Sequence, residues 1–548
     1  MHSHPFMNSL QVKLALNLLE NKKIQGGMDL DIEKSIAKGI LLACFPLHQN
    51  DMCEEIANRW YKHGHTYPWR KPYHLVKDYF GEKVGLYYRF LGFYLSYLLG
   101  SSIVGAIMQI VVFATDDFSS PAVPFYSFFV VLWAVFFTEH WIRAEKTFAM
   151  QWGMYGYETS EADRPQFYGE TIKSLVNGKE MVHFSHRKAN ELLRYSVSII
   201  GSLILLVIGT TASVYVARNA MAADGGVFGI DADTIASVIN SIQITIFNAI
   251  YSKVAKRLTD QENHRTNTEY EDAMIAKLFC FQFVNSFSSF FFIAFCAKFL
   301  PKIEGDAAEN VGQCGAKDCM YTLGINLAIV LIVRLTVGNF QEFILPSILN
   351  WYHGVLNTRL SLAERQFRRP DYDFIQDSID DYSELLIQFG YQTLFVTALP
   401  LSTLLVMINN HFQLRYDVEK MLFLTRRVYP KSAEDIGTWQ SVFELMTVCA
   451  VPANAALVAF TMTTFDNKSI YVRFWLFIGI QWFVFTLQSI MKSIIPDVPA
   501  QVSIQLQRAN FVVSKVIDHV PDDLDGKSCR NFTVFHSFIY LFIYYLII

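Results

Sequence analysis

The 548-residue sequence has few charged side chains and none of the local patterns of a soluble enzyme. Asp, Glu, Lys and Arg supply 18% of the residues, whereas hydrophobic residues supply 52% and aromatic residues 15%. Soluble domains carry more charge and fewer apolar residues, so this balance favours a membrane protein. A nucleophile elbow, a phosphate-binding loop and the histidine spacing of metal hydrolases are absent, so we expect no enzymatic activity.

Two further absences narrow the class of protein. The formal net charge is only -4 and no Lys/Arg block is interleaved with aromatic residues, which argues against nucleic-acid binding. The opening residues, MHSHPFMNSLQVKLALNLLENKK, contain no basic segment followed by an apolar run and a cleavage site. We therefore expect no secretory signal peptide, and membrane insertion through internal spans.

Ten apolar runs approach the length of about 20 residues that crosses a bilayer as a helix. They centre on Leu86–Ala114, Ala122–Ile142, Leu192–Val216, Thr234–Val254, Ala273–Leu300, Thr322–Trp351, Leu385–Pro400, Leu401–Tyr416, Ser441–Thr464 and Ile470–Ile495. The seventh and eighth runs are short and meet at Pro400, where we expect a tight reversal. The predicted fold is an all-α polytopic membrane protein with ten transmembrane helices per subunit.

The charges of the loops predict the orientation of the spans, because Lys and Arg near span ends stay in the cytosol. Basic residues gather in Arg143–Arg194, Lys253–Lys277, Arg359–Arg369 and Lys420–Lys431. The alternate loops are acidic or nearly neutral, which places both termini in the cytosol.

Two features of the loops then fall outside the cytosol. Cys314 and Cys319 are the disulfide candidate, and two unpaired loop thiols are the alternative. Asn467 opens an Asn-Lys-Ser sequon and is a glycosylation candidate.

Three regions are expected along the chain. Residues 1–77 mix apolar and charged positions and are predicted to form a small cytosolic α/β domain. Residues 78–496 form the transmembrane domain, and 497–548 a cytosolic C-terminal segment. The apolar tail 532–548 fits an eleventh span, an interfacial segment or an artefact of gene prediction.

Polar residues follow helical spacing within two of the spans. In the fourth run these are Ser237, Ser241, Thr245, Asn248 and Ser252, and in the fifth run Gln282, Asn285, Ser286 and Ser289. Two neighbouring polar stripes are what a hydrophilic groove or pore requires. Hydrogen bonding between the helices is the alternative explanation.

A charged residue also lies deep in the sixth run. Arg334 at this depth costs roughly 2.5 to 3.5 kcal/mol on insertion scales, so it needs a partner or water. It either attracts anions or lipid phosphates into a groove, or it forms a structural ion pair or hydrogen bond.

Carboxylates from three spans are predicted to meet at one depth. Glu342 lies toward the cytosolic half of the sixth run, Asp381 and Glu384 begin the seventh, and Gln413 and Asp417 end the eighth. Unpaired carboxylates in a low dielectric repel one another, so the cluster calls for cations. Oxygen ligands of this kind suit Ca²⁺. For Asp381 and Glu384 alone, favourable placement at a helix N-terminus is the alternative.

Several segments resemble the anoctamin family. They are Ile246–Ala255 with Leu258–Thr266, Asp78–Tyr87, Arg164–Phe167, Phe281–Asn285, Gln388–Gly390 and Ile495–Pro499. The resemblance runs from about Tyr73 to Ile517, and the cytosolic domain before it is short for the family. It implies a ten-span homodimer in which the third to seventh spans of each subunit line a groove for lipid headgroups or ions.

The resemblance also implies that Ca²⁺ binds between the sixth, seventh and eighth spans. The family's calcium acids fall on Glu342, Asp381, Glu384 and Asp417. Two positions depart from the family: Gly338 stands where Asn is usual, and Gln413 where Glu is usual. Asp497 resembles a secondary calcium ligand.

These departures suggest how calcium acts on this chain. Loss of one charge at Gln413 predicts weaker calcium binding or one ion in place of two. Gly338, one turn before Glu342, is a hinge candidate, with close helix packing as the alternative.

The interpretation favours a calcium-activated phospholipid scramblase with accompanying ion conduction. Gln282 stands where chloride-conducting relatives tend to carry Lys, and the serine-rich fourth span suits lipid headgroups. A calcium-activated chloride channel and a non-transporting membrane tether are the alternatives. The expected partners are phospholipids, chloride or other small ions, and a second copy of the chain. The plasma membrane is the expected location, with an internal membrane as the alternative.

Overall fold

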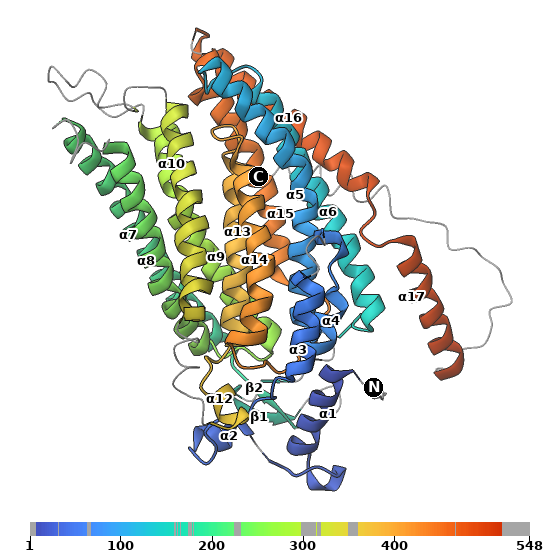
Figure 1. Ribbon diagram of the computed structural model, residues 1–548. Coiled ribbons are helices and arrows are strands. Elements are labelled where there is room, and N and C mark those ends of the chain that lie inside the picture. Colours follow the sequence, from blue (N-terminus) through green and yellow to red (C-terminus); the bar gives the residue numbers. More distant parts are fainter. Residues whose placement is uncertain are drawn as a thin grey trace. The chain divides into compact units, whose positions relative to one another are not determined.

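The computed structural model describes most of the chain. The described residues are 7–30, 32–62, 67–157, 161, 163–164, 166–173, 178, 180–223, 232–297, 314, 319–348, 360–465 and 467–517. The chain divides into two compact units, Met1–Asp497 and Val498–Ile548. In the first unit nearly all regular structure is helical (Figure 1).

Eight helices in the described part are long and apolar enough to cross a membrane. They are α5 (Glu82–Thr115), α6 (Val123–Trp152), α7 (His186–Ala223), α8 (Ala232–Gln261), α9 (Asn267–Phe291) with η5 (Phe292–Cys296), α10 (Cys319–Val333) with η7 (Arg334–Gly338), α15 (Thr438–Ala456) with η10 (Leu457–Thr461), and α16 (Ile470–Ile494). Each coincides with one of the ten predicted runs.

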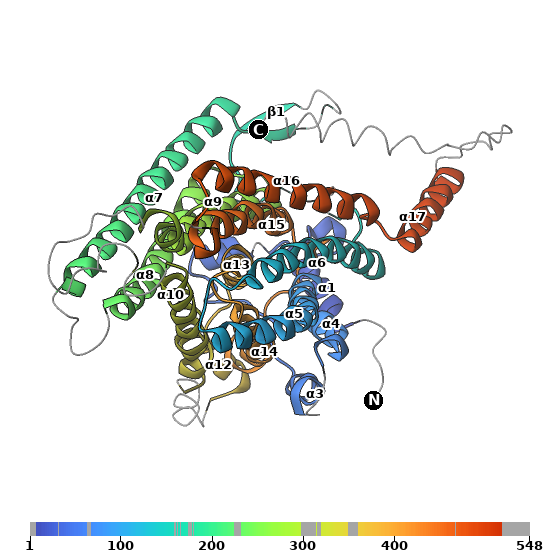
Figure 2. The same cartoon turned by 90° about the horizontal axis from the view of Figure 1, so that it is seen from above.

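The seventh and eighth predicted runs correspond to α13 (Phe374–Leu394) and α14 (Ser402–Glu419). Neither helix is apolar enough to count as a span by composition alone. Seen from above, α13 lies in the middle of the bundle, and it contacts α6, α9, α14 and α15 (Figure 2). A helix covered by other helices meets little lipid, so it tolerates more polar residues.

The reversal predicted at Pro400 is confirmed. Only residues 395–401 separate the two helices, and glycines on neighbouring helices make room for this turn. A Cβ on Gly105 of α5 would lie 2.5 Å from the Pro400 carbonyl oxygen, and one on Gly324 of α10 would lie 2.6 Å from that of Ala398. Larger residues at either glycine would push the turn out of the core.

The N-terminal segment packs within the first unit. It consists of α1 (Asn8–Glu20), η1 (Lys23–Gln25), α2 (Ile32–Ala37), α3 (Asn50–Ala57), η2 (Asn58–Lys62), η3 (Pro68–Arg70) and α4 (Tyr73–Phe80). Its described residues form helices and no strand, so the α/β character expected for 1–77 is not seen there. The strands β1 (Glu170–Lys173) and β2 (Glu180–His183) lie between α6 and α7 instead, paired antiparallel with Glu170 opposite His183.

A polar hub attaches this segment to the loops of the bundle. The ring nitrogens of His48 lie 3.1 Å from the Tyr79 hydroxyl and 3.2 Å from the Thr425 carbonyl oxygen. The His48 backbone N–H donates to Gln366 Oε1 at 2.8 Å. Gln366 belongs to α12 (Leu362–Phe367), whose first turn is fixed by a capping box between Ser361 and Glu364. Burial, with Arg369 and then Arg427 nearby, lowers the pKa of His48 to about 4.

The segment that most resembles the family forms the turn between α8 and α9. Glu262 in this turn is buried and accepts hydrogen bonds from Lys277 Nζ at 2.6 Å and from His264 at 2.9 Å. Burial by itself raises the pKa of Glu262, but these donors outweigh it and lower the pKa to about 2. Asn263 adopts a positive φ of 56° and its amide donates to the Tyr168 carbonyl at 2.7 Å. These residues fix the turn between two membrane helices.

The predicted loop features have definite positions. Cys314 and Cys319 form a disulfide, with their Cα atoms 4.9 Å apart. Asn467 is exposed in the loop before α16, after η11 (Thr463–Phe465).

The second unit is described by itself. It contains α17 (Ala500–Val512) and η12 (Val513–Ile517). The apolar tail 532–548 lies outside the described residues.

Candidate functional site

A cavity of about 370 Å³ lies between α8, α9, α10 with η7, and α13. We call it the groove cavity. Its lining includes a polar wall of side chains from α8 and α9 and acids from α13. It also includes Arg334 and Gly338 of η7 and the apolar residues Val330, Val333 and Val337.

The two polar stripes divide between the cavity and the helix interface. Lining residues are Ser241, Thr245 and Asn248 of α8 and Gln282 of α9. Asn285 is buried and donates to Asn248 Oδ1 at 2.8 Å and to the Ile244 carbonyl at 3.0 Å. Asn248 therefore both lines the cavity and joins the two helices, whereas Asn285 belongs to the helix interface.

The remaining stripe residues do not line the groove cavity. Ser237 and Ser286 are buried. Ser252 accepts a hydrogen bond of 2.7 Å from Gln376 Nε2 of α13.

Arg334 and Gly338 mark an irregular part of the sixth predicted span. The helix changes from α to π at Arg334, and a second π segment, η8 (Phe340–Ile344), follows. The Arg334 guanidinium lies over the Tyr391 ring, 5.7 Å from its centroid. A Cβ on Gly338 would meet no atom within 4 Å, so close packing does not explain this glycine. Irregular turns of this kind are where helices bend.

Four acids of α13 face the groove cavity. They are Asp377, Asp380, Asp381 and Glu384. The helix starts where it does because Asp373, at the N-cap, accepts hydrogen bonds from the backbone N–H groups of Ile375 and Gln376. Tyr372 donates to Asp381 Oδ2 at 3.2 Å, and Gln388 donates to Glu384 Oε1 at 2.9 Å.

Asp417 of α14 lies close enough to act electrostatically on Asp381. A small second cavity, of about 10 Å³, lies between these helices. Its oxygen-bearing lining residues are Glu384, Asp417, Gln413, Asn409, Asn339 and Tyr416. This volume is close to that needed by a single water molecule or ion.

The hydrogen bonds of the Gln413 side chain indicate whether the site suits a cation. Its amide nitrogen is directed to the Tyr87 hydroxyl at 3.4 Å, while its carbonyl oxygen Oε1 is buried without a hydrogen-bond partner among the described residues. A buried carbonyl oxygen without a donor is costly, and a cation would satisfy it. Glu384, Asp417 and Gln413 thus offer oxygen donors of the kind that Ca²⁺ accepts.

Two observations limit the predicted metal site. Glu342 belongs to η8, but its side chain lies outside the described part of the chain. Among the described side chains, no three His, Cys, Asp or Glu residues stand close enough together to hold a metal. Of the four predicted acids, Glu384 and Asp417 line the same small cavity, and Asp417 acts electrostatically on Asp381.

Sequence reasoning missed Lys420, the first residue of η9 (Lys420–Leu424). Lys420 lines both the groove cavity and the small cavity and attracts Asp377, Asp380 and Asp381. Helical spacing could have found it, because Lys420 follows Asp417 of α14 by three residues. The same spacing would have added Asp377, four residues before Asp381.

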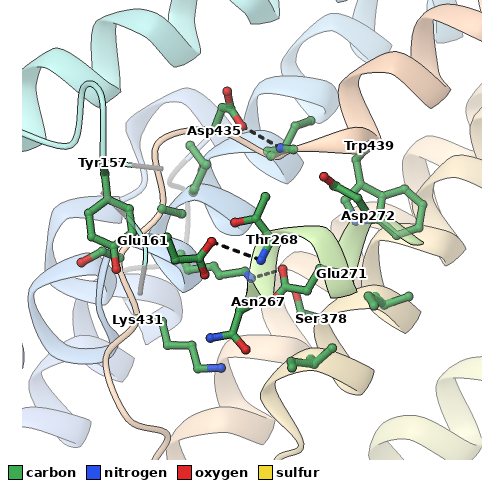
Figure 3. A pocket seen from close by; sticks show the side chains of 18 of the residues that line it. Tyr157, Glu161, Asn267, Thr268, Glu271, Asp272, Ser378, Lys431, Asp435 and Trp439 are labelled. Carbon is green, nitrogen blue, oxygen red and sulfur yellow. Dashed lines mark hydrogen bonds and ion pairs between the residues drawn. The ribbon is translucent and has the colours of Figure 1, made fainter. Parts of the chain in front are cut away.

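A separate cavity of about 390 Å³ lies among α1, α5, α9, α13 and the loop before α15 (Figure 3). Its polar lining includes Tyr157, Glu161, Glu271 and Lys431. Lys83 pairs with Glu271, Lys13 pairs with Glu82, and Glu161 accepts from the Thr268 N–H at 3.3 Å. Acids and bases neutralise one another here, so the lining favours no ligand of one charge.

The Asp497 prediction concerns another part of the bundle. Asp497 is exposed and acts electrostatically on Glu139 of α6. Lys492 of α16 forms ion pairs with Glu139 at 3.3 Å and with Glu444 of α15 at 3.4 Å.

Comparison with known proteins identifies the family. The anoctamin profile, described as "Anoctamin: Calcium-activated chloride channel", matches residues 76–509. The chain belongs to the anoctamin family. The resemblance noted in the sequence is thereby confirmed, and with the eight apolar helices it makes this chain an integral, multi-pass membrane protein.

Individual anoctamins are similar over most of this chain. Human Anoctamin-7 is 30% identical over 516 residues, which cover 79% of this chain and 55% of that protein. Mouse Anoctamin-3 is 28% identical over 540 residues, covering 83% and 54%, and human Anoctamin-4 is 27% identical over 542 residues, covering 83% and 56%. The chain thus spans little more than half the length of these anoctamins.

Proposed function

We propose that this anoctamin is a calcium-activated phospholipid scramblase that moves lipid headgroups along the groove cavity, with accompanying ion conduction. The observation that carries the proposal is that one cavity holds both the polar wall of α8 and α9 and the acids of α13. A cation that draws the acids together therefore acts directly on the wall of the transport path.

The lining chemistry favours zwitterionic headgroups. Hydroxyl and amide groups of Ser241, Thr245, Asn248 and Gln282 offer both donors and acceptors, and Arg334 offers a positive charge for a phosphate. A side of the groove open to lipid would let the acyl chains stay in the bilayer while the headgroup crosses.

The assembly proposed is a homodimer of ten-span subunits with both termini in the cytosol. The reversal at Pro400 supports counting α13 and α14 as the seventh and eighth spans, since two adjacent crossings keep the flanking loops on one side. We assign the protein to the plasma membrane on the family likeness.

The residues proposed to hold Ca²⁺ are Glu342, Asp381, Glu384 and Asp417, with Gln413 as a neutral oxygen donor. When bound, the ion supplies positive charge that offsets repulsion among these carboxylates. We propose one ion per subunit, since Gln413 removes one negative charge and the cavity beside it is small.

The chain's own residues convert this charge balance into movement. Tyr372, Gln388 and Tyr87 donate hydrogen bonds to carboxylates of α13 and α14. These bonds hold the carboxylates, and with them the two helices, in place. The π segments η7 and η8, on either side of Asn339, form the less regular element. We propose that this element bends at Gly338 when Glu342 is drawn toward α13.

A calcium-activated chloride channel is the second candidate. Arg334 lies in the groove cavity and would attract an anion. Gln282 in place of a cationic residue weighs against it. A non-transporting tether is the third candidate, and it leaves the polar lining and the acids without a use.

Reconstitution into liposomes tests the three candidates. Fluorescent-lipid reduction by dithionite and chloride efflux are measured in parallel, with and without calcium. Calcium-dependent lipid flux is the expected result. Chloride flux alone would replace the scramblase with the channel, and silence in both assays would leave the tether.

A further inference from the structure

A lysine near the C-terminal end of α16 lies between glutamates of two other helices. Lys492 Nζ is 3.3 Å from Glu139 Oε1 of α6 and 3.4 Å from Glu444 Oε2 of α15. The helices α6, α15 and α16 also pack against one another. One ammonium group therefore connects three helices at the same level.

Glu139 is the buried member of this cluster. The Glu139 side chain is only 4% exposed, whereas Glu444 is 32% and Lys492 is 41% exposed. A buried carboxylate that loses its partner is strongly destabilising, so Glu139 needs a cation at this position.

A third carboxylate adds to the negative charge. Asp497 follows α16 and acts electrostatically on Glu139, in the same direction as Glu444. The chain before it is held by Arg143, whose guanidinium donates to the Pro496 carbonyl at 2.7 Å. Two acids thus contact the lysine, and a third acid acts on the buried one of that pair.

We propose that Lys492 is the resident cation of this cluster and excludes a divalent metal ion from it. Calcium binds carboxylate oxygens at about 2.3–2.6 Å, and the Lys492 ammonium already contacts the two oxygens that such an ion would use. Like charges would repel each other at that separation, so ammonium and metal are mutually exclusive.

Asp497 is not a calcium ligand in this chain as long as Lys492 is present. The attachment of α16 to α6 and α15 is then independent of calcium, because the chain itself provides the positive charge. The inference does not depend on the proposed transport function.

Calcium binding to the purified full-length chain tests the proposal. A background carrying Glu384→Gln and Asp417→Asn removes acids of the proposed gating site. In that background, Lys492→Gln should gain about one bound Ca²⁺ per chain by equilibrium binding. Millimolar calcium should also raise its Tm by about 2–4 °C. Lys492→Arg keeps the positive charge and is the matched control, expected to gain neither effect.

Two results would overturn the proposal. One is calcium binding by the background protein, with Lys492 intact, that Glu139→Gln abolishes, since a metal would then share the cluster with the lysine. The other is a folded Lys492→Gln variant that gains no calcium. Should that variant fail to fold, the comparison of the background with and without Glu139→Gln decides alone: equal calcium binding supports the lysine as resident cation.

Discussion

Tyr87 of α5 donates a hydrogen bond from its hydroxyl group to Asp417 Oδ2 of α14 at 2.8 Å. The same hydroxyl lies 3.4 Å from Gln413 Nε2, one turn earlier on α14. The amide nitrogen of Gln413 is thereby directed to α5, and its carbonyl oxygen is left as the buried atom without a donor. A tyrosine outside the predicted site thus sets how two of its residues are presented.

Restoring a carboxylate at position 413 should strengthen calcium binding. Gln413→Glu adds one negative charge beside Asp417 and Glu384, so the calcium concentration for half-maximal flux should fall roughly tenfold (about 1.4 kcal/mol). Lipid flux is measured in liposomes over a calcium series. Gln505→Glu in α17 adds the same charge elsewhere and should leave the curve unchanged. An unmoved curve for Gln413→Glu would refute the assigned role of this residue.

Lys420 should oppose calcium binding at the same site. Its ammonium attracts the acids of α13 and lines both cavities, so it competes with an added cation. Lys420→Met should lower the calcium concentration for half-maximal flux by roughly threefold to tenfold, and direct calcium binding should tighten in parallel. Lys420→Arg preserves the charge and should resemble the unmodified protein. Weaker binding in Lys420→Met would show that the lysine supports the site instead.

The two kinds of stripe residue should respond differently to substitution. Asn285→Ala removes the bond to Asn248 and should reduce the free energy of unfolding by about 1 kcal/mol. Thr245→Leu places an apolar side chain in the groove cavity and should slow lipid flux severalfold with little change in Tm. Both quantities are measured for both variants. Full lipid flux in Thr245→Leu would remove this cavity from the transport path.

Acid should loosen the hub around His48. Its pKa is about 4 in the folded protein against an ordinary 6.5, with Cys53, Tyr79, Arg369 and Arg427 as neighbouring ionisable groups. Between these values the unfolded chain binds more protons, so the free energy of unfolding should fall as pH drops, by about 3 kcal/mol at most. Thermal unfolding in detergent from pH 7 to 4 measures the effect.

His48→Gln provides the comparison for that measurement. Glutamine keeps hydrogen-bonding groups but does not titrate, so the variant should lose less stability over this pH range than the unmodified protein. Equal pH dependence in both proteins would contradict a role for His48.

Local sequence patterns predicted much of the fold. Apolar length alone located eight helices that are confirmed as candidate spans, because a bilayer of fixed thickness demands a fixed helical length. Apolar length gives a weaker signal for α13 and α14, because α13 is covered by other helices and need not be apolar. The strands β1 and β2 lie between α6 and α7, where the sequence offers an Asn177-Gly178 pair, a common hairpin turn, as the local signal that the prediction did not use.

Only the tertiary structure decided what each polar side chain does. Helical spacing placed Asn248 and Asn285 on their stripes. The packing of α8 against α9 joins these two side chains by a hydrogen bond, whereas Gln282 lines the groove cavity. The two lysines illustrate the same limit. Lys420 and Lys492 lie among acids of other helices, and helical periodicity gives the face of a residue without giving the neighbour that this face meets.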